Sequence, residues 1–398
     1  MNSRSAKALR FPLFTFLLAL VVVLSSSCGS SSSMNAKKLT SSVQQVMKAS
    51  NAPGAVVGVW QKGQAPYLLA FGKADLKTSR MMATGDVLRE ASITKTYTGL
   101  EILRLVDKGK VALSDTLSKW DFSKGLPNRE VVTIQMLLTH TSGYPDPSND
   151  YEPFIEQIFA NPEREWTPQE LVQWAIQDPA YTPPGQQYRY SNFGYGLLGM
   201  VIQHITGKPL ADVFQSDLFT PLGLKNTGFD NGPGFLTSKQ HSAGYFTNVQ
   251  ANMPPGQEAT GPKLKDVTAW NTSWTWAAGS MVANAADLKT WIEADAKGTL
   301  LKPATVKLQQ QTDTVVTQPG KPTRQGLGII ITPLANGNNF YWHNGAVPGY
   351  STWAGSDPAD GVTIVVLINQ NPTSDGDPEL ASELALKLIN DVGLTIKQ

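Results

Sequence analysis

The chain has 398 residues, of which 41% are hydrophobic and 16% are charged, so it carries enough apolar material for a large core and is not a disordered sequence. Its 33 Lys and Arg residues are balanced by 32 Asp and Glu residues, which leaves no cationic face of the size that a nucleic-acid-binding protein needs. We therefore expect one large domain or two closely packed ones, with small or uncharged partners and no nucleic acid.

The first 28 residues have the pattern of an export signal. Arg4, Lys7 and Arg10 precede an apolar run over residues 11–24, which is shorter than the roughly 20 residues that a bilayer-spanning helix needs. Cys28 is the only cysteine, and its place after the apolar run resembles that of the lipidated cysteine in a bacterial lipoprotein signal. The alternative is ordinary cleavage in the Ser-rich stretch, which would leave a soluble exported protein. In either case we predict a protein exported to the cell envelope, and any attachment to a membrane is expected only through the lipid anchor at Cys28.

Residues 29–35 are polar and Ser-rich, as suits a flexible tether, and the folded part is predicted to begin near Ala36. Apolar spacing predicts a helix over residues 37–50. Two apolar runs, residues 54–60 and 67–71, flank a polar turn and predict a β-hairpin.

The middle of the chain, about residues 93–291, mixes helical stretches with Pro- and Gly-rich loops. Strand patterns return near the C-terminus, followed by a helical pattern over residues 379–392; the predicted strands cover residues 327–332, 339–343, 351–355 and 362–369. Strands at both ends with helices between them predict an α+β fold with one sheet built from the two chain ends, about 36–75 and 325–398, and a helical part over about 92–300.

The stretch LREASITKTYTGLEIL places Ser92 and Lys95 three residues apart at the start of a predicted amphipathic helix that ends near Gly109. Residues i and i+3 are neighbours on a helix, so the Lys95 amine can lie beside the Ser92 hydroxyl. A partly desolvated lysine can take the proton of a serine and make it a nucleophile. The pair alone is weak evidence, because Ser-x-x-Lys arises by chance about once in a chain of this length.

Two more short patterns follow in order: Tyr190-Ser191-Asn192 and His343-Asn344-Gly345. Together the three patterns resemble those of the penicillin-recognising serine hydrolases, which include class C β-lactamases, low-molecular-weight D-alanyl-D-alanine carboxypeptidases and their esterase and D-aminopeptidase relatives. Other segments match in kind, so that the resemblance extends from about Ala36 to Val392; these segments are residues 133–143, 181–185, 221–224, 278–281 and 345–350. The resemblance implies a β-lactamase/transpeptidase-like fold, with an antiparallel sheet flanked by terminal helices and a mostly helical insertion.

The same resemblance assigns catalytic roles. It implies that Ser92 is the nucleophile that forms an acyl-enzyme, and that Lys95 and Tyr190 share its proton. Which of the two is the base stays open, because close titrating groups behave as a coupled unit. His140 invites a Ser-His interpretation, but we predict a structural role for it, since a base is already supplied.

Asn192, Gly345 and Ala346, together with His343, are implied in substrate binding. Asn192 resembles the residue that holds the substrate amide. The backbone N–H groups of Ser92 and Ala346 resemble an oxyanion hole, and Gly345 would let its strand approach the substrate closely. No metal or organic cofactor is expected. Among the tryptophans, Trp270, Trp274 and Trp276 are predicted to line a groove.

The residue at position 343 indicates which substrates the site can bind. A lysine at this position would supply a permanent cation for a substrate carboxylate, whereas histidine is mostly neutral at pH 7 unless its pocket raises its pKa. We predict a serine hydrolase of the D-alanyl-D-alanine carboxypeptidase type that acts on small peptide, amide, ester or β-lactam substrates. The enzymatic alternatives are a class C-like β-lactamase or a carboxylesterase, and the alternative of another class is a catalytically silent protein that binds cell-wall peptides or β-lactams.

Overall fold

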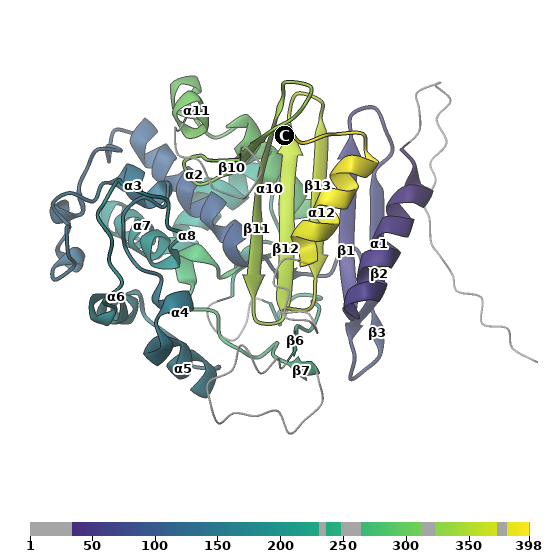
Figure 1. Ribbon diagram of the computed structural model, residues 1–398, viewed down its shortest axis with the longest axis horizontal. Helices are drawn as coiled ribbons and strands as arrows, with labels where there is room; N and C mark the ends of the chain where they lie inside the picture. Colours follow the sequence, from purple (N-terminus) through teal and green to yellow (C-terminus); the bar gives the residue numbers. More distant parts are fainter. Residues whose placement is uncertain (1–33, 231–235, 248–263, 312–322, 372–379, 398) are drawn as a thin grey trace, which may run out of the picture. The chain divides into compact units, whose positions relative to one another are not determined.

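An antiparallel sheet formed by both ends of the chain is the centre of the fold (Figure 1). The computed structural model describes residues 34–230, 236–247, 264–311, 323–371 and 380–397, so the predicted signal segment, Cys28 and most of the tether lie outside the described residues. In this part of the chain the sheet has eight strands in the order β3-β2-β1-β13-β12-β11-β10-β9. Their bounds are β1 Gly54–Gln61, β2 Tyr67–Asp75, β3 Arg80–Met81, β9 Arg324–Gln325, β10 Ile330–Pro333, β11 Asn339–Val347, β12 Tyr350–Asp357 and β13 Val362–Ile368.

Strands β1 and β13 join the two chain ends in the middle of the sheet. Val57 lies opposite Val366 and Val56 lies opposite Leu367, and all four side chains are fully buried. Because successive side chains in a strand point to opposite faces, these strands are apolar on both sides and need cover on both.

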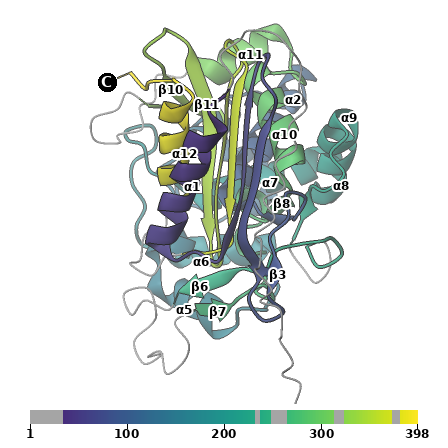
Figure 2. The same cartoon turned by 90° about the vertical axis from the view of Figure 1, so that its right-hand side faces the viewer.

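Two terminal helices cover one face of the sheet. Helix α1 (Ala36–Ser50) and helix α12 (Leu380–Asp391) lie side by side there (Figure 2). Leu39 and Val43 from α1 and Leu384 from α12 belong to the same buried cluster as Val57 and Val366 of the sheet. The spacing of apolar residues in each helix therefore supplies one layer of the core.

The other face of the sheet packs against helices of the central part of the chain (Figure 2). Val56 and Leu367 point to this side and share a second buried cluster with residues of α2 and α10. The helices of this part are α2 Thr94–Asp107, α3 Ile134–Leu138, α4 Pro147–Asp150, α5 Glu152–Ala160, α6 Pro168–Gln177, α7 Asn192–Thr206, α8 Leu210–Phe214, α9 Thr220–Leu222, α10 Ala285–Lys297 and α11 Pro303–Gln310. Two small sheets accompany them: β4 Leu88–Arg89, β8 Met281–Ala283 and β5 Gly228–Phe229, and β6 Tyr245–Thr247 with β7 Leu264–Asp266.

The α+β architecture predicted from the sequence is confirmed, with the sheet at both chain ends and the helices between. The strand expected from residue 327 begins instead at Ile330, because Gly328 has a φ of 91° and the chain turns there. None of the helices within the described ranges combines the length and the hydrophobicity that crossing a bilayer requires.

Candidate active site

The Ser92–Lys95 pair lies where the chain passes from strand β4 into helix α2. Ser92 occupies a 3₁₀ turn, Ala91–Ile93, and α2 continues from Thr94. The tight turn keeps the i, i+3 relation that the spacing predicted, and the Lys95 Nζ atom lies 3.1 Å from the Ser92 Oγ atom. This distance is within reach of direct proton transfer between the two side chains.

The backbone around this pair is held in an unusual conformation. Ala91, immediately before Ser92, has a φ of 50°, and His140 and Trp276 have φ values of 57° and 35°. Non-glycine residues rarely adopt such angles, and they persist only where the surrounding structure fixes them, as happens at functional sites. All three of these residues belong to segments that approach Lys95, as the next contacts show.

Lys95 is a buried amine with three acceptors. Its Nζ atom donates to Asn192 Oδ1 at 2.6 Å and to the Ala278 carbonyl at 2.8 Å, in addition to its contact with Ser92. Burial lowers the pKa of Lys95 to about 7, and the negative charge of Asp146 opposes that shift. When the amine is neutral, its two N–H groups can stay on Asn192 and Ala278, which leaves its lone pair directed at the Ser92 hydroxyl.

Asn192 connects Lys95 to a carboxylate. While its Oδ1 atom accepts from Lys95, its Nδ2 atom donates to Asp146 Oδ2 at 2.9 Å and to Ser148 Oγ at 3.2 Å. Both amide hydrogens therefore have acceptors within the protein. A substrate carbonyl would have to displace one of these contacts to meet the role implied for Asn192.

Tyr190 lies over the lysine, just before α7. The Lys95 Nζ atom is 4.7 Å from the centre of the Tyr190 ring, and a hydrogen bond joins the phenol to the Ser92 side chain. Burial raises the pKa of Tyr190 well above its usual value, although the bond with Ser92 opposes the rise. The phenol therefore keeps its proton at neutral pH and is suited to donating it.

His140 stacks on Tyr190, with ring centres 4.4 Å apart. Its Nδ1 atom accepts the backbone N–H of Ser191 at 3.1 Å, so the ring proton is on Nε2, which has no hydrogen-bond partner among the described residues. Burial and the charge of Lys95 lower the pKa of His140 well below its usual value. A neutral ring packed against Tyr190 agrees with the structural role predicted for His140.

Strand β11 brings the third pattern alongside. His343 is buried, and its Nδ1 atom donates to the Asn344 carbonyl at 2.6 Å. Burial and, to a lesser degree, the charge of Lys95 lower the pKa of His343 to about 3. The imidazole is therefore uncharged at neutral pH and offers no cation to a substrate carboxylate.

Gly345 lies directly against the nucleophile turn. A Cβ atom at this position would be 2.3 Å from the Glu90 carbonyl oxygen and 2.8 Å from the Ser92 backbone nitrogen, so only glycine allows the strand to come this close. Ala346 follows at the next position of β11, half-buried and paired with Ser351 of β12. The Ser92 and Ala346 backbones are thus neighbours across Gly345, and their part in an oxyanion hole remains a prediction.

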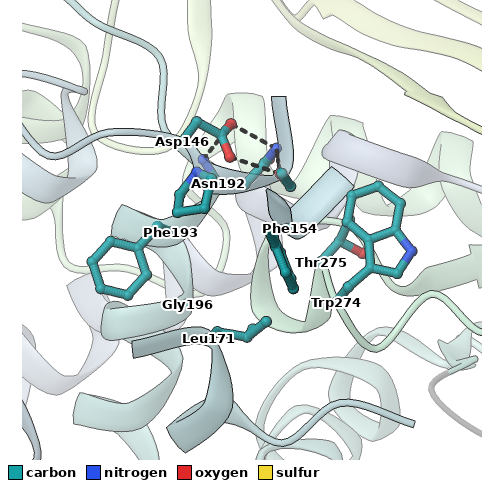
Figure 3. Close-up of a pocket in the computed structure, with 10 residues that line it drawn as sticks. Asp146, Phe154, Leu171, Asn192, Phe193, Gly196, Trp274 and Thr275 are labelled. Carbon is teal, nitrogen blue, oxygen red and sulfur yellow. Dashed lines mark hydrogen bonds between the residues drawn. The ribbon is translucent and has the colours of Figure 1, made fainter. Parts of the chain in front are cut away.

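A pocket adjoins the cluster on the helical side (Figure 3). Asp146 and Asn192 stand at one end of it, joined by hydrogen bonds, and mostly apolar side chains surround the rest. Its empty volume is about 290 Å³ including the part open to solvent; the lining residues are Asp146, Pro147, Ser148, Phe154, Leu171, Asn192, Phe193, Gly196, Trp274 and Thr275.

Of the three tryptophans predicted to line a groove, only Trp274 lines this pocket. Trp276 is buried in the core, and Trp270 packs against Phe159 and Phe246. Asp146 and the Ala278 carbonyl were not anticipated, because they lie far from Lys95 in the sequence. Within the described ranges, no three His, Cys, Asp or Glu side chains gather in a way that could hold a metal ion.

Comparison with known proteins places this geometry in a family. Residues 39–388 match the family model described as Beta-lactamase. The chain belongs to this family. This confirms the resemblance found in the sequence and the β-lactamase/transpeptidase-like fold that it implied. The superfamily comprises β-lactamases and penicillin-binding proteins, and its members are serine hydrolases.

Individual relatives agree with the family. Protein flp of Staphylococcus aureus strain MW2 is 26% identical over 359 residues, which cover 87% of this chain and 65% of that protein, so the chain spans about two thirds of its length. The D-amino acid amidase of Ochrobactrum anthropi SV3, solved in complex with L-phenylalanine, is 25% identical with a TM-score of 0.75, covering 89% of this chain and 97% of the amidase. A D-stereospecific amidohydrolase from a Streptomyces species is 26% identical with a TM-score of 0.72, covering 87% and 97%.

Proposed function

We propose that the protein is a serine hydrolase of the D-alanyl-D-alanine carboxypeptidase type, which cleaves peptide, amide or ester bonds through an acyl-enzyme on Ser92. The observation that carries this proposal is the buried Lys95 amine, whose pKa is about 7 and whose Nζ atom lies 3.1 Å from the Ser92 hydroxyl. A lysine with an ordinary pKa near 10.4 would be almost fully protonated at neutral pH and could not accept the serine proton.

The contacts support one division of labour among the three catalytic groups. Neutral Lys95 takes the proton of Ser92 as the oxygen attacks the substrate carbonyl carbon, and the acyl group becomes bonded to Ser92 as the leaving group departs. Tyr190 is the better donor to the leaving group, because its raised pKa keeps it protonated, and the Lys95 ammonium then returns a proton to the phenolate. Water next attacks the acyl-enzyme while neutral Lys95 takes its proton, and this proton passes to the Ser92 oxygen as the acid product leaves.

The charge of the site favours one group of substrates. With His343 neutral, binding of a free substrate carboxylate gains no ion pair from this residue. Within that type of hydrolase, this supports substrates whose leaving group carries no free carboxylate over peptides that end in D-alanine, as do the similar D-amino acid amidase and D-stereospecific amidohydrolase.

The test is intact-protein mass spectrometry after mixing with a penicillin, together with hydrolysis of a D-alanine amide and a p-nitrophenyl ester, by wild type and Ser92→Ala. We expect an acyl adduct and hydrolysis in the wild type only, with activity lowered at least about 10³-fold in the variant, because no other group replaces the nucleophile. Thermal unfolding of both proteins checks that the variant is folded.

The outcomes separate the alternatives. A lasting penicillin adduct indicates a carboxypeptidase-like enzyme, and loss of penicillin without an adduct indicates a β-lactamase. Ester or amide hydrolysis without any reaction with penicillin indicates an esterase or amidase. Binding without any turnover would indicate a silent binding protein, and equal hydrolysis by Ser92→Ala would refute the mechanism.

A further inference from the structure

Asp146 is a buried carboxylate that none of the predicted catalytic roles uses. It immediately precedes the short helix α4, and only 2% of its surface is exposed. Burial of an acidic group needs compensation by hydrogen bonds or by an opposite charge. The partners of Asp146 therefore indicate what it does.

Every partner of Asp146 is a hydrogen-bond donor. Its Oδ2 atom accepts from the Asn192 backbone N–H at 3.1 Å, from Asn192 Nδ2 at 2.9 Å and from Asn149 Nδ2 at 2.9 Å. Its Oδ1 atom accepts from the Ser148 hydroxyl at 2.7 Å. Burial raises the pKa of Asp146, while the hydrogen bonds from Ser148 and the Asn192 backbone and the charge of Lys95 oppose the rise. The acceptor role of both oxygens fits the ionised carboxylate.

These contacts leave one orientation for the Asn192 side chain. If the carboxamide rotated by 180°, its oxygen would face the Asp146 carboxylate and its NH₂ group would face the Lys95 amine. Two acceptors would then meet at the Asp146 end. At the other end the NH₂ group would meet the donors of the Lys95 ammonium, or would take up the lone pair of the neutral amine that is needed for Ser92. Asp146 thereby determines that an oxygen, and not an amide nitrogen, faces Lys95 at 2.6 Å.

We propose that Asp146 is a positioning residue of the active site, which fixes the Asn192 carboxamide with its oxygen toward Lys95 and places one negative charge behind that amide. The inference rests on the proposed serine hydrolase function. In the acylation step, the Asn192 oxygen holds one N–H of the neutral amine, so that the lone pair of Lys95 stays directed at Ser92. The negative charge of Asp146 stabilises the ammonium that forms when Lys95 takes the proton.

Among the described residues, Asp146 is the only carboxylate whose charge raises the pKa of Lys95. The other titratable groups that face the amine are Tyr190 and Tyr195, whose rings lie 4.7 and 5.7 Å from Nζ, and the imidazoles of His140 and His343. These four are uncharged at neutral pH, because burial raises the pKa of both tyrosines and lowers the pKa of both histidines. Removal of the Asp146 charge therefore changes the electrostatic environment of Lys95 while these four groups stay uncharged.

The test uses Asp146→Asn, which keeps the size of the side chain but removes its charge and allows Asn192 to rotate. The matched control is Asp150→Asn, which removes the same charge at the other end of the short helix α4; Asp150 pairs with Arg189 at 2.9 Å. The first measurement is a pH titration of the full chain labelled with ¹³C at the lysine ε-carbon. The Lys95 signal is assigned by its loss in Lys95→Arg.

We expect the Lys95 signal to titrate at a pH lower by about 1 unit in Asp146→Asn, since an opposite charge at this range shifts a pKa by about 1–3 units. In Asp150→Asn the midpoint should stay at the wild-type value. An unchanged midpoint in Asp146→Asn would overturn the inference, and this measurement does not depend on any activity.

The second measurement is the pH profile of kcat/KM for ester hydrolysis. In Asp146→Asn the acidic limb should move to lower pH by the same amount, while the plateau falls about tenfold or more because the amine is no longer held toward Ser92. A general loss of stability would lower the plateau without moving the limb. If the wild type shows no Ser92-dependent hydrolysis, the proposed function fails, while the titration still decides the role of Asp146.

Asp146→Glu provides a second variant in case Asp146→Asn does not fold. It keeps the negative charge but displaces it by one methylene group, so the Lys95 midpoint should stay within about 0.5 unit of wild type while kcat falls. A wild-type kcat in a folded Asp146→Glu protein would contradict the positioning role.

Discussion

At the scale of single residues, the site depends on how closely a strand approaches the nucleophile. Gly345 occupies the point of β11 where a side chain would touch the Glu90 carbonyl and the Ser92 nitrogen. Thr352 of the next strand donates to the same Glu90 carbonyl at 2.8 Å, which fixes the turn against the sheet. The nucleophile is thus positioned by the large sheet as well as by its own helix.

Gly345→Ala should therefore lower the catalytic activity more than the stability of the fold. The new Cβ atom would meet two backbone atoms, at 2.3 and 2.8 Å, and backbone cannot move aside as a flexible side chain can. A displacement of about 1 Å between Ser92 and its partners is expected to lower kcat/KM about 100-fold. Steady-state hydrolysis and thermal unfolding would be measured for this variant and for the control Gly85→Ala, whose Cβ meets nothing within 4 Å. Wild-type kcat/KM in Gly345→Ala would refute this account of the turn.

Residue identity and order predicted Ser92, Lys95, Tyr190 and Asn192 as a group, and the structure brings them together. The Ser92–Lys95 contact is local, so the helix period was enough to predict it. Asp146 lies between two prolines, where a turn is the obvious interpretation, and its link to Asn192 spans 46 residues. No local pattern encodes such a contact, and only the packing of α4 against α7 creates it.

At the scale of elements, helices α10 and α11 share a buried pair that is also unrelated to any local pattern. Gln309 Nε2 of α11 donates to Asp295 Oδ1 of α10 at 2.8 Å. Asp295 Oδ2 and Gln309 Oε1 have no hydrogen-bond partner in the described part of the chain. Burial raises the pKa of Asp295 to about 7, although the bond from Gln309 opposes the rise.

Asp295→Asn should stabilise the protein above neutral pH. A raised carboxyl pKa contributes stability that is complete below the unfolded pKa of 3.8 and is lost as the pH rises through about 7. Asparagine has no proton to lose, and its amide can donate to Gln309 Oε1 while still accepting from Nε2. Relative to wild type, the variant should gain on the order of 2–4 kcal/mol of unfolding free energy at pH 8 and little at pH 4.

Thermal and urea unfolding at both pH values would measure this gain. The control is Asp121→Asn, at a side chain that is 88% exposed and pairs with Lys124 at the surface. An equal effect of Asp295→Asn at pH 4 and pH 8 would show that the carboxyl does not titrate between them.

The strands of the large sheet were easier to predict than the short ones. Strands β1 and β13 carry apolar side chains on both faces, and their runs are long enough to be recognised. Strands β4, β5 and β8 have two or three residues each and exist only because distant segments meet, as Arg89 and Val282 do. Their formation is a property of the tertiary fold and has no local signal.

At the scale of the whole molecule, the large sheet separates the N-terminal helix from the site. Helices α1 and α12 cover one face (Figure 2), where Lys38 pairs with Asp391 at 3.2 Å. Ala91 and Ile93, the neighbours of Ser92, belong to the buried cluster on the other face. Helix α1, which follows the predicted tether in the sequence, thus lies on the face away from the nucleophile.

The location of the molecule follows from Cys28 if our prediction of an export signal holds. We expect the full chain, produced in a bacterium that processes lipoproteins, to incorporate radiolabelled palmitate and to sediment with membranes. Cys28→Ala should incorporate no label, yet hydrolyse the same substrates with unchanged kcat/KM, because the large sheet lies between α1 and the site. Label retained by Cys28→Ala, or an unlabelled wild type in the soluble fraction, would contradict the anchor. A change in kcat/KM would instead contradict the separation of anchor and site. This separation is expected because the seven residues 29–35 can extend at most about 25 Å from the start of α1.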